Sequence, residues 1–118
     1  MGITTTYVTI INPQNPKQGQ ELEFLVDSGA VYSVAPKETL EKIGIKPHRK
    51  QVFTLTDGSK VEREMGDCIY ELEGIRGAAP IVFGKKGDAT LLGIFTLEAL
   101  GLALDPFKRK LKPMKLIL

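Results

Sequence analysis

Cysteine and histidine are almost absent from this chain, whose 118 residues include one of each, Cys68 and His48. A single cysteine excludes a disulfide within the chain. His48 lies in a polar, basic connector and is best interpreted as a solvated surface residue. No group of His, Cys or Asp residues has the spacing of metal ligands. The sequence therefore predicts no metal site.

Long apolar runs and a strong charge imbalance are also missing. No apolar stretch is long enough to span a bilayer, and the N-terminus has no signal-peptide pattern. The net charge is only +2, which is too mild to indicate a nucleic-acid partner. We therefore expect a cytoplasmic protein that binds neither membranes nor nucleic acid. The length suits a single compact domain, residues 1–118.

The most distinctive stretch that is present is Phe24-Leu25-Val26-Asp27-Ser28-Gly29-Ala30, in which an acidic residue ends an apolar run. This pattern predicts a buried strand that leads to a carboxylate at a tight turn, where an unused charge is costly. Gly29 lets the backbone turn or approach closely, and Ser28 can form a hydrogen bond across the turn. Asp27 is therefore a candidate catalytic residue. The structural alternative is a turn aspartate that caps local amides.

A later segment repeats part of an earlier one. Residues 39–45 read TLEKIGI, and residues 96–102 read TLEALGL. Asp27-Ser28-Gly29 precedes the first copy, whereas Leu91-Leu92-Gly93 precedes the second. We infer two related halves, of which only the first carries the acid. If the chemistry needs two carboxylates, the other must come from another molecule.

Alternation, β-branched residues and turn residues predict many short strands and two short helices. Strands are expected at 4–11, 21–26, 52–56, 60–64, 68–72, 80–83, 90–92, 102–106 and 110–118, with Cys68 on one of them as a buried or half-buried packing residue. Helices are expected from Pro36 to just before Gly44 and at 94–100. The interpretation places a loop at 12–19, a two-residue hairpin turn at Asp57-Gly58, further turns at Gly74, Gly77, Gly84 and Gly87, and ordinary loop residues at Asp57, Asp67 and Asp88. Together these elements predict a mainly β protein with a closed or nearly closed sheet.

Two of these motifs resemble the signatures of the retropepsin-like aspartic proteases. The first is Asp27-Ser28-Gly29-Ala30 followed by Ser33-Val34-x-Pro36, and the second is Leu91-Leu92-Gly93 before a helix. Asp-Ser-Gly alone recurs by chance, but two signatures at this separation, with a hairpin between them, are much more specific. The resemblance extends from about residue 6 to residue 113, and the closing segment looks more like cellular and prokaryotic-type members than viral ones.

The resemblance implies a small closed β-barrel of the retropepsin-like acid protease type, with one or two short helices, that forms a homodimer. It implies an aspartic endopeptidase without cofactor or metal, in which one aspartate per subunit activates a water to hydrolyse peptide or protein substrates. By this resemblance Asp27 is the catalytic residue, and Ser28, Gly29 and Ala30 belong to the active-site loop. The flap is formed by Thr54, Leu55, Thr56, Asp57, Gly58, Ser59 and Lys60. Leu91, Leu92 and Gly93 form the second signature, which is structural. Ser28 would brace the two active-site loops across the dimer.

The chain departs from the viral pattern at three places. Val31 stands where viral enzymes usually have Asp or Asn, and Ile94 stands where they have a basic residue that supports the dimer. The hairpin turn has one glycine, Gly58, with charged neighbours, so a glycine-rich apolar flap is absent. An alternative of another class therefore stays open: a non-catalytic dimerisation or peptide-binding module that retains the protease fold.

Overall fold

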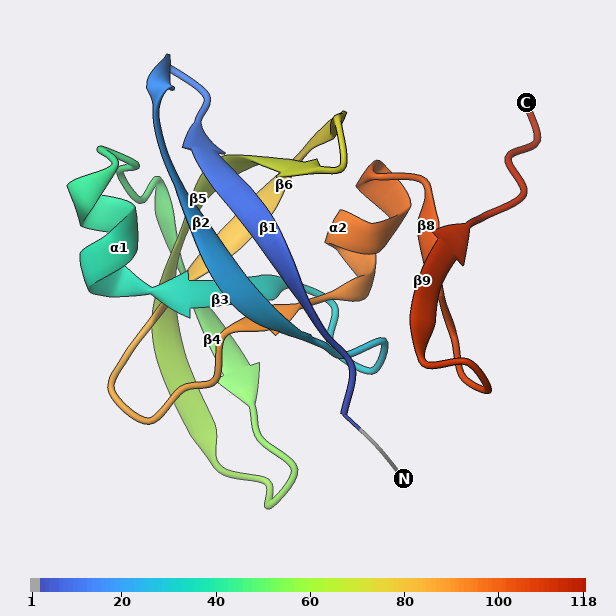
Figure 1. The fold of residues 1–118 in the computed structure, drawn as a ribbon. Helices are drawn as coiled ribbons and strands as arrows, with labels where there is room; N and C mark the ends of the chain where they lie inside the picture. Colours follow the sequence, from blue (N-terminus) through green and yellow to red (C-terminus); the bar gives the residue numbers. More distant parts are fainter. Residues whose placement is uncertain (1–2) are drawn as a thin grey trace.

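A computed structural model describes residues 3–118, in which nine strands and two short helices are present (Figure 1). The strands are β1 (Thr5–Asn12), β2 (Asn15–Val26), β3 (Ser33–Pro36), β4 (Arg49–Thr54), β5 (Lys60–Leu72), β6 (Ile75–Gly84), β7 (Leu91–Leu92), β8 (Leu102–Asp105) and β9 (Lys110–Pro113). The helices are α1 (Lys37–Lys42) and α2 (Ile94–Ala99). The mainly β class and the two short helices are confirmed.

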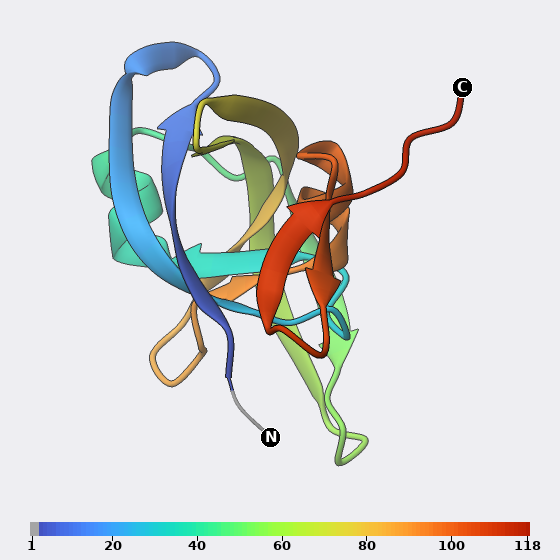
Figure 2. The ribbon, with the colours of Figure 1, turned by 45° about the vertical axis from the view of Figure 1, so that its right-hand side comes forward.

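The main sheet closes on itself. Its seven strands follow the order β1-β2-β7-β3-β6-β5-β4, and β1 also pairs with β5. Six strands therefore form a ring, which leaves no open edge among them, and β4 extends the sheet outward from β5. The strands β8 and β9 form a separate two-stranded sheet beside α2 (Figures 1 and 2).

Alternate side chains fill the interior of the ring. On β1, Val8 and Ile10 are fully buried, whereas Tyr7 is exposed and Thr9 is half-buried, because successive side chains of a strand point to opposite faces. Phe24 and Tyr70 are also fully buried. The hydroxyl of Tyr70 donates a hydrogen bond to the carbonyl of Pro80 at 2.9 Å, so its burial leaves no unsatisfied polar group.

Strand pairing supports the two related halves. Val34 lies five residues before the first repeat, and Leu91 lies five residues before the second. These two equivalent residues pair with each other in antiparallel β3 and β7. Val34 also pairs with Val82 on β6, just as Leu91 pairs with Leu25 on β2. Reciprocal pairing of this kind marks a local two-fold axis between the halves.

The same axis identifies the counterpart of the acidic turn. Asp27 lies seven residues before Val34, and Gly84 lies seven residues before Leu91. The turn between β2 and β3 thus corresponds to the turn between β6 and β7, where glycine replaces the aspartate. The second half therefore supplies no acid at this position.

Two predicted loop features are wrong. The loop predicted at 12–19 is reduced to a turn at Pro13-Gln14, because β2 already begins at Asn15, and the pairing of β1 with β2 shifts register between Ile11 and Asn12. Gly77 is not a turn residue but lies within β6. A Cβ at Gly77 would lie 2.6 Å from the carbonyl oxygen of Ala99, so glycine here lets the end of α2 approach the strand.

The hairpin turn between β4 and β5 also differs from the prediction. The N–H of Leu55 donates to the carbonyl of Ser59, and the N–H of Gly58 donates to the carbonyl of Leu55, which encloses Thr56-Asp57-Gly58. A two-residue turn of the expected type needs positive φ at both central residues, but only Gly58 has it, at 86°. Asp57 instead accepts hydrogen bonds from the hydroxyl and N–H of Ser59, which lower the pKa of the Asp57 carboxyl.

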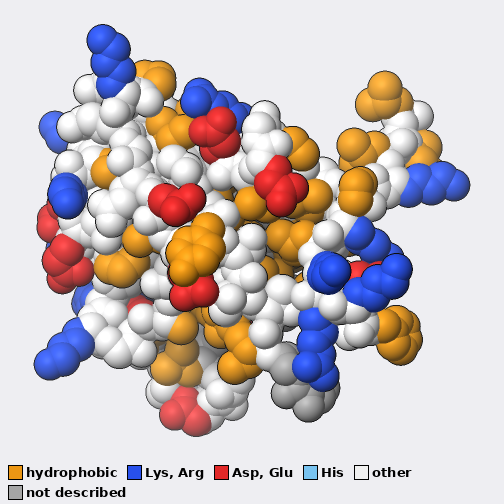
Figure 3. Space-filling view, in the orientation of Figure 1, with side chains coloured by type: hydrophobic (Ala, Val, Ile, Leu, Met, Phe, Trp, Pro, Cys, Tyr) orange, Lys and Arg blue, Asp and Glu red, His pale blue; other side chains and the backbone are white. Residues whose placement is uncertain are grey.

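The predicted terminal strand at 110–118 ends early. β9 stops at Pro113, and the following residues leave the body of the molecule (Figures 1 and 3). Leu116 and Ile117 are 73% and 81% exposed on this segment. The alternation of apolar and polar residues in the sequence thus continues beyond Lys110–Pro113, the strand that pairs with β8.

Cys68 provides a chemical test of the core. Its side chain is fully buried, and burial raises the pKa of the thiol to about 12. Because the thiolate is the reactive form, we expect the native protein to resist 5,5′-dithiobis(2-nitrobenzoate) at pH 8. One thiol per chain should react after denaturation in urea. Rapid reaction of the native protein would contradict the packing described here.

Candidate active site

Backbone and side-chain hydrogen bonds hold Asp27 at the end of β2. Its N–H donates to the carbonyl of Leu92 at 3.0 Å, and the N–H of Ala30 donates to the carbonyl of Asp27 at 3.1 Å. The carboxylate oxygen Oδ1 accepts a hydrogen bond from the N–H of Gly29 at 2.9 Å. A Cβ at Gly29 would lie 3.2 Å from the same oxygen, so glycine gives the carboxylate room. The result is an oriented, partly exposed carboxylate beside the exposed Ser28.

The loop that carries Asp27 caps the start of α2. The N–H of Ile94 donates to the carbonyl of Ala30 at 2.8 Å, and the N–H of Phe95 donates to the carbonyl of Val31 at 3.0 Å. The first N–H groups of a helix have no partner within the helix, so they need acceptors elsewhere. The loop supplies these acceptors, and the helix fixes the loop in return.

A buried hydroxyl pair lies beneath this contact. Ser33 Oγ accepts a hydrogen bond from the N–H of Gly93 at 3.0 Å and is 2.6 Å from Thr96 Oγ1. Both hydroxyl residues are fully buried. A Cβ at Gly93 would lie 2.7 Å from the backbone of Tyr32 and from the carbonyl oxygen of Val31. The glycine of the second motif therefore permits the close approach of the two segments.

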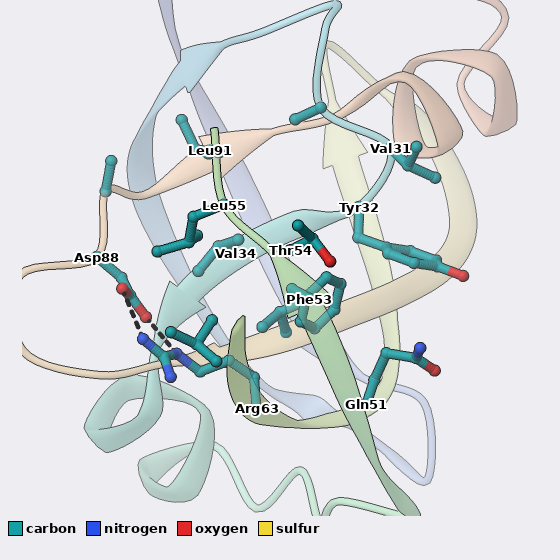
Figure 4. Close-up of a pocket in the computed structure, with 14 residues that line it drawn as sticks. Val31, Tyr32, Val34, Gln51, Phe53, Thr54, Leu55, Arg63, Asp88 and Leu91 are labelled. Carbon is teal, nitrogen blue, oxygen red and sulfur yellow. Dashed lines mark hydrogen bonds and ion pairs between the residues drawn. The ribbon is translucent and has the colours of Figure 1, made fainter. Parts of the chain in front are cut away.

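A cavity of about 630 Å³ lies between this loop and the β4–β5 hairpin (Figure 4). The inner face of the hairpin contributes alternate side chains: Gln51, Phe53, Val61 and Arg63. The other walls come from the turn after Asp27, from Val34 and Val82 on β3 and β6, and from Asp88, Ala89 and Leu91. Most of the lining is apolar, so the cavity suits a bulky uncharged group.

The structure brings some of the predicted site residues together and separates others. Ala30, Thr54, Leu55 and Leu91 line the same cavity, although they come from three segments of the chain. The remaining hairpin residues, 56–60, are exposed and lie outside the lining. Leu92 and Gly93 are buried behind it.

Three aromatic rings connect the site's elements, and the sequence analysis gave none of them a role. Tyr32 stacks on Phe95 of α2, with ring centroids 6.2 Å apart and planes at 19°. Tyr32 also meets Phe53 of β4 edge to face, again at 6.2 Å. These are favourable aromatic geometries, so they link the loop, the helix and the hairpin. Phe53 and Leu55 alternate with Thr54 and Thr56 in the sequence, and this is a signal that could have placed Phe53 on the inner face.

An ion pair lies at the other side of the cavity from Tyr32 (Figure 4). Arg63 Nε is 2.7 Å from Asp88 Oδ2, and Arg63 Nη2 is 3.1 Å from Asp88 Oδ1. The hydrogen bond from Arg63 holds the pKa of Asp88 below its usual range. Asp88 lies in the loop between β6 and β7, as predicted, but its ion pair with Arg63 was not predicted. Arg63 lies on β5, 25 residues earlier in the chain, and no local sequence pattern indicates the contact.

The other minor predictions have mixed outcomes. His48 is exposed as expected, and its Nε2 lies 3.1 Å from Asp67 Oδ1. Asp67, however, lies within β5 rather than in a turn. Within residues 3–118, no three or more His, Cys, Asp or Glu side chains are grouped so as to hold a metal ion. In the same range no helix combines the length and apolar character needed to cross a membrane.

Part of the chain matches a protein-family model. Residues 16–69, which include Asp27-Ser28-Gly29 and the hairpin, match the family model described as aspartyl protease. No curated protein matches the chain.

Two solved structures share the fold. EIAV protease, complexed with the inhibitor HBY-793, is 22% identical at a TM-score of 0.58, and the match covers 99% of this chain and 94% of that one. The retroviral protease-like domain of Ddi1 from Leishmania major is 20% identical at a TM-score of 0.55, and the match covers 95% of this chain and 90% of that one. The resemblance to the retropepsin-like aspartic proteases is thus confirmed.

The close approach at Gly93 predicts a strong steric effect. We expect Gly93→Ala to lower the free energy of unfolding by about 1–3 kcal/mol, because its Cβ would meet rigid backbone. The matched control is Gly29→Ala in the same loop, whose Cβ would meet only the Asp27 carboxylate. Urea unfolding of both variants measures the difference. Equal free energies of unfolding for the two variants would show that the loop backbone does not closely contact Gly93.

Proposed function

We propose that the protein is an aspartic endopeptidase that acts as a homodimer, with Asp27 of each chain as one of two catalytic carboxylates. The observation that carries this proposal is the Asp27 carboxylate, oriented by Gly29 at a partly exposed turn that continues into Ala30 in the wall of an apolar cavity. The fold shared with acid proteases supports the same reaction class.

The chemistry needs two carboxylates in different protonation states. Two such groups about 3 Å apart cannot both ionise cheaply, so they share one proton. The ionised group takes a proton from water, whose oxygen attacks the peptide carbonyl carbon while the protonated group donates to the carbonyl oxygen. The tetrahedral intermediate then collapses and the C–N bond breaks: the amine nitrogen takes the proton that the first carboxyl received from water, and the second carboxylate takes a proton from a hydroxyl of the intermediate.

One chain has only half of this pair. Among residues 3–118, the hydrogen-bond partner of the Asp27 side chain is the Gly29 N–H, and the two-fold-related position holds Gly84. A second copy related by a two-fold axis through the site would supply the missing carboxylate. In this arrangement the Ser28 hydroxyls would brace the two loops, as the family resemblance implies.

The surface around Asp27 suits apolar contact with that second copy. Val31 and Phe95 are 55% and 46% exposed, and backbone hydrogen bonding places them together. Viral enzymes have charged or polar side chains at the positions of Val31 and Ile94. We therefore infer that apolar burial replaces ionic contacts in this dimer.

The substrate would lie as an extended strand between the active-site loop and the β4–β5 hairpin. Backbone hydrogen bonds would hold such a strand, and the cavity would take one of its side chains. The hairpin segment 54–60 would then serve as the flap, with Leu55 toward the substrate and the charged tip in solvent.

Asp27→Asn tests the catalytic role. We expect the wild type to cleave a mixed peptide library between pH 4 and 7 and the variant, still folded and dimeric, to lose activity at least about 10³-fold. Mass spectrometry of the products measures both. If neither protein cleaves at concentrations where dimer is demonstrated, the catalytic proposal fails and the peptide-binding module takes its place.

Val31→Asp tests the dimer surface. Placing like charges on either side of a two-fold axis should raise the dimer dissociation constant at least about tenfold. Val52→Asp is the matched control, because Val52 is 53% exposed on the outer face of the hairpin. Sedimentation velocity over a concentration series measures both constants. Equal constants for the two variants would place the interface elsewhere.

A further inference from the structure

Arg63 is a cationic side chain of the hairpin that lines the cavity, and Asp88 neutralises its charge in an ion pair. Both residues line the cavity, and their side chains point toward each other in Figure 4. The guanidinium meets the carboxylate through two parallel hydrogen bonds, of 2.7 and 3.1 Å. Such bidentate pairs are directional as well as strong.

This pair differs from the other ion pairs of the hairpin. The side chains of Arg63 and Asp88 are 15% and 28% exposed. In contrast, Lys50 and Glu62 are 67% and 58% exposed, with their charged atoms 4.0 Å apart. Exposed pairs of this second kind contribute little, whereas a shielded bidentate pair keeps its geometry.

Asp88 is held in place independently of Arg63. Its Oδ2 accepts a hydrogen bond from the N–H of Lys85 at 2.8 Å, and its own N–H donates to the Lys85 carbonyl. The turn between β6 and β7 therefore presents the carboxylate to the guanidinium. This turn is the two-fold counterpart of the turn that carries Asp27.

The pair decides the charge that a ligand would meet. A free guanidinium beside apolar walls would attract a carboxylate or phosphate. Paired with Asp88, it offers no net charge, and an acidic ligand group would have to displace or approach the Asp88 carboxylate. The remaining walls, such as Phe53, Val61 and Leu91, favour apolar groups.

We propose that Asp88 is a specificity-determining residue: by neutralising Arg63, it makes the cavity select a bulky uncharged side chain of the substrate and reject an acidic one. This inference rests on the proposed function, because it concerns the substrate of the same site. Asp88 would act on the substrate only through Arg63 and would take no part in the chemical step.

Asp88→Asn is the test, since an amide oxygen can still accept the Lys85 N–H while the negative charge is lost. The assay uses a set of peptides in which each position around the cleavage site carries either Phe or Glu, and cleavage is measured at pH 6. Asp88 is ionised at this pH, because Arg63 lowers its pKa from an already acidic value. We expect the Glu-to-Phe ratio of kcat/KM to rise at least about tenfold at one position.

Two further variants separate this effect from a structural one. In the double variant Arg63→Met, Asp88→Asn the gain for Glu should disappear, because no cation remains. Glu62→Gln, which breaks the exposed pair with Lys50, should leave the wild-type preference unchanged. A uniform loss of activity on all peptides in Asp88→Asn, without a changed ratio, would overturn the proposal.

Binding measurements keep the test independent of catalysis. The same Phe and Glu peptides, made with a reduced and therefore uncleavable bond, give dissociation constants by fluorescence anisotropy. If the wild type binds but does not cleave, the endopeptidase proposal fails while the Glu-to-Phe ratio of affinities still tests Asp88. An unchanged ratio of affinities in Asp88→Asn, or no binding of either peptide to any variant, would refute the assigned role.

Discussion

The start of α2 and the loop that carries Asp27 satisfy each other's backbone groups, and the candidate site depends on this contact. Ile94 and Phe95 donate N–H groups to the loop carbonyls, while Ser33 receives the N–H of Gly93 from below. Because Gly93 has no side chain, the two segments can touch. The position of the Asp27 carboxylate thus follows from a glycine and a helix that lie far along the chain.

Under the proposed function, one chain is half of a catalytic unit, and the local two-fold axis shows how its two halves differ. Val34 and Leu91 pair with each other as equivalent residues, so the two halves form one closed sheet. Yet the turns they generate have diverged: one presents Asp27, and the other presents Asp88 to Arg63 across the cavity. On the account proposed here, one turn supplies the chemistry and the other sets the charge of the neighbouring pocket.

Features with a local cause could be predicted from the sequence. Gly44 and Gly101 follow the two helices at positive φ, as their positions after apolar helical stretches indicate. The acidic turn and the hairpin were likewise visible in short motifs. The closure of β1 on β5, the length of β5 and the Arg63–Asp88 pair depend on partners distant in sequence, for which a single sequence carries no signal. The turn at Asp57 differed because its carboxylate bonds Ser59, an alternative that competes locally with the two-residue turn.

The central claim, that two chains each contribute one Asp27, is tested most directly by mixing. Wild-type and Asp27→Asn chains are combined at constant total concentration, well above the dimer dissociation constant, and allowed to exchange before peptide cleavage is measured. With random pairing of equal amounts, only about one quarter of the dimers carry two aspartates, so activity should fall to about one quarter. A fall to about one half would mean that each chain works alone and would contradict the account.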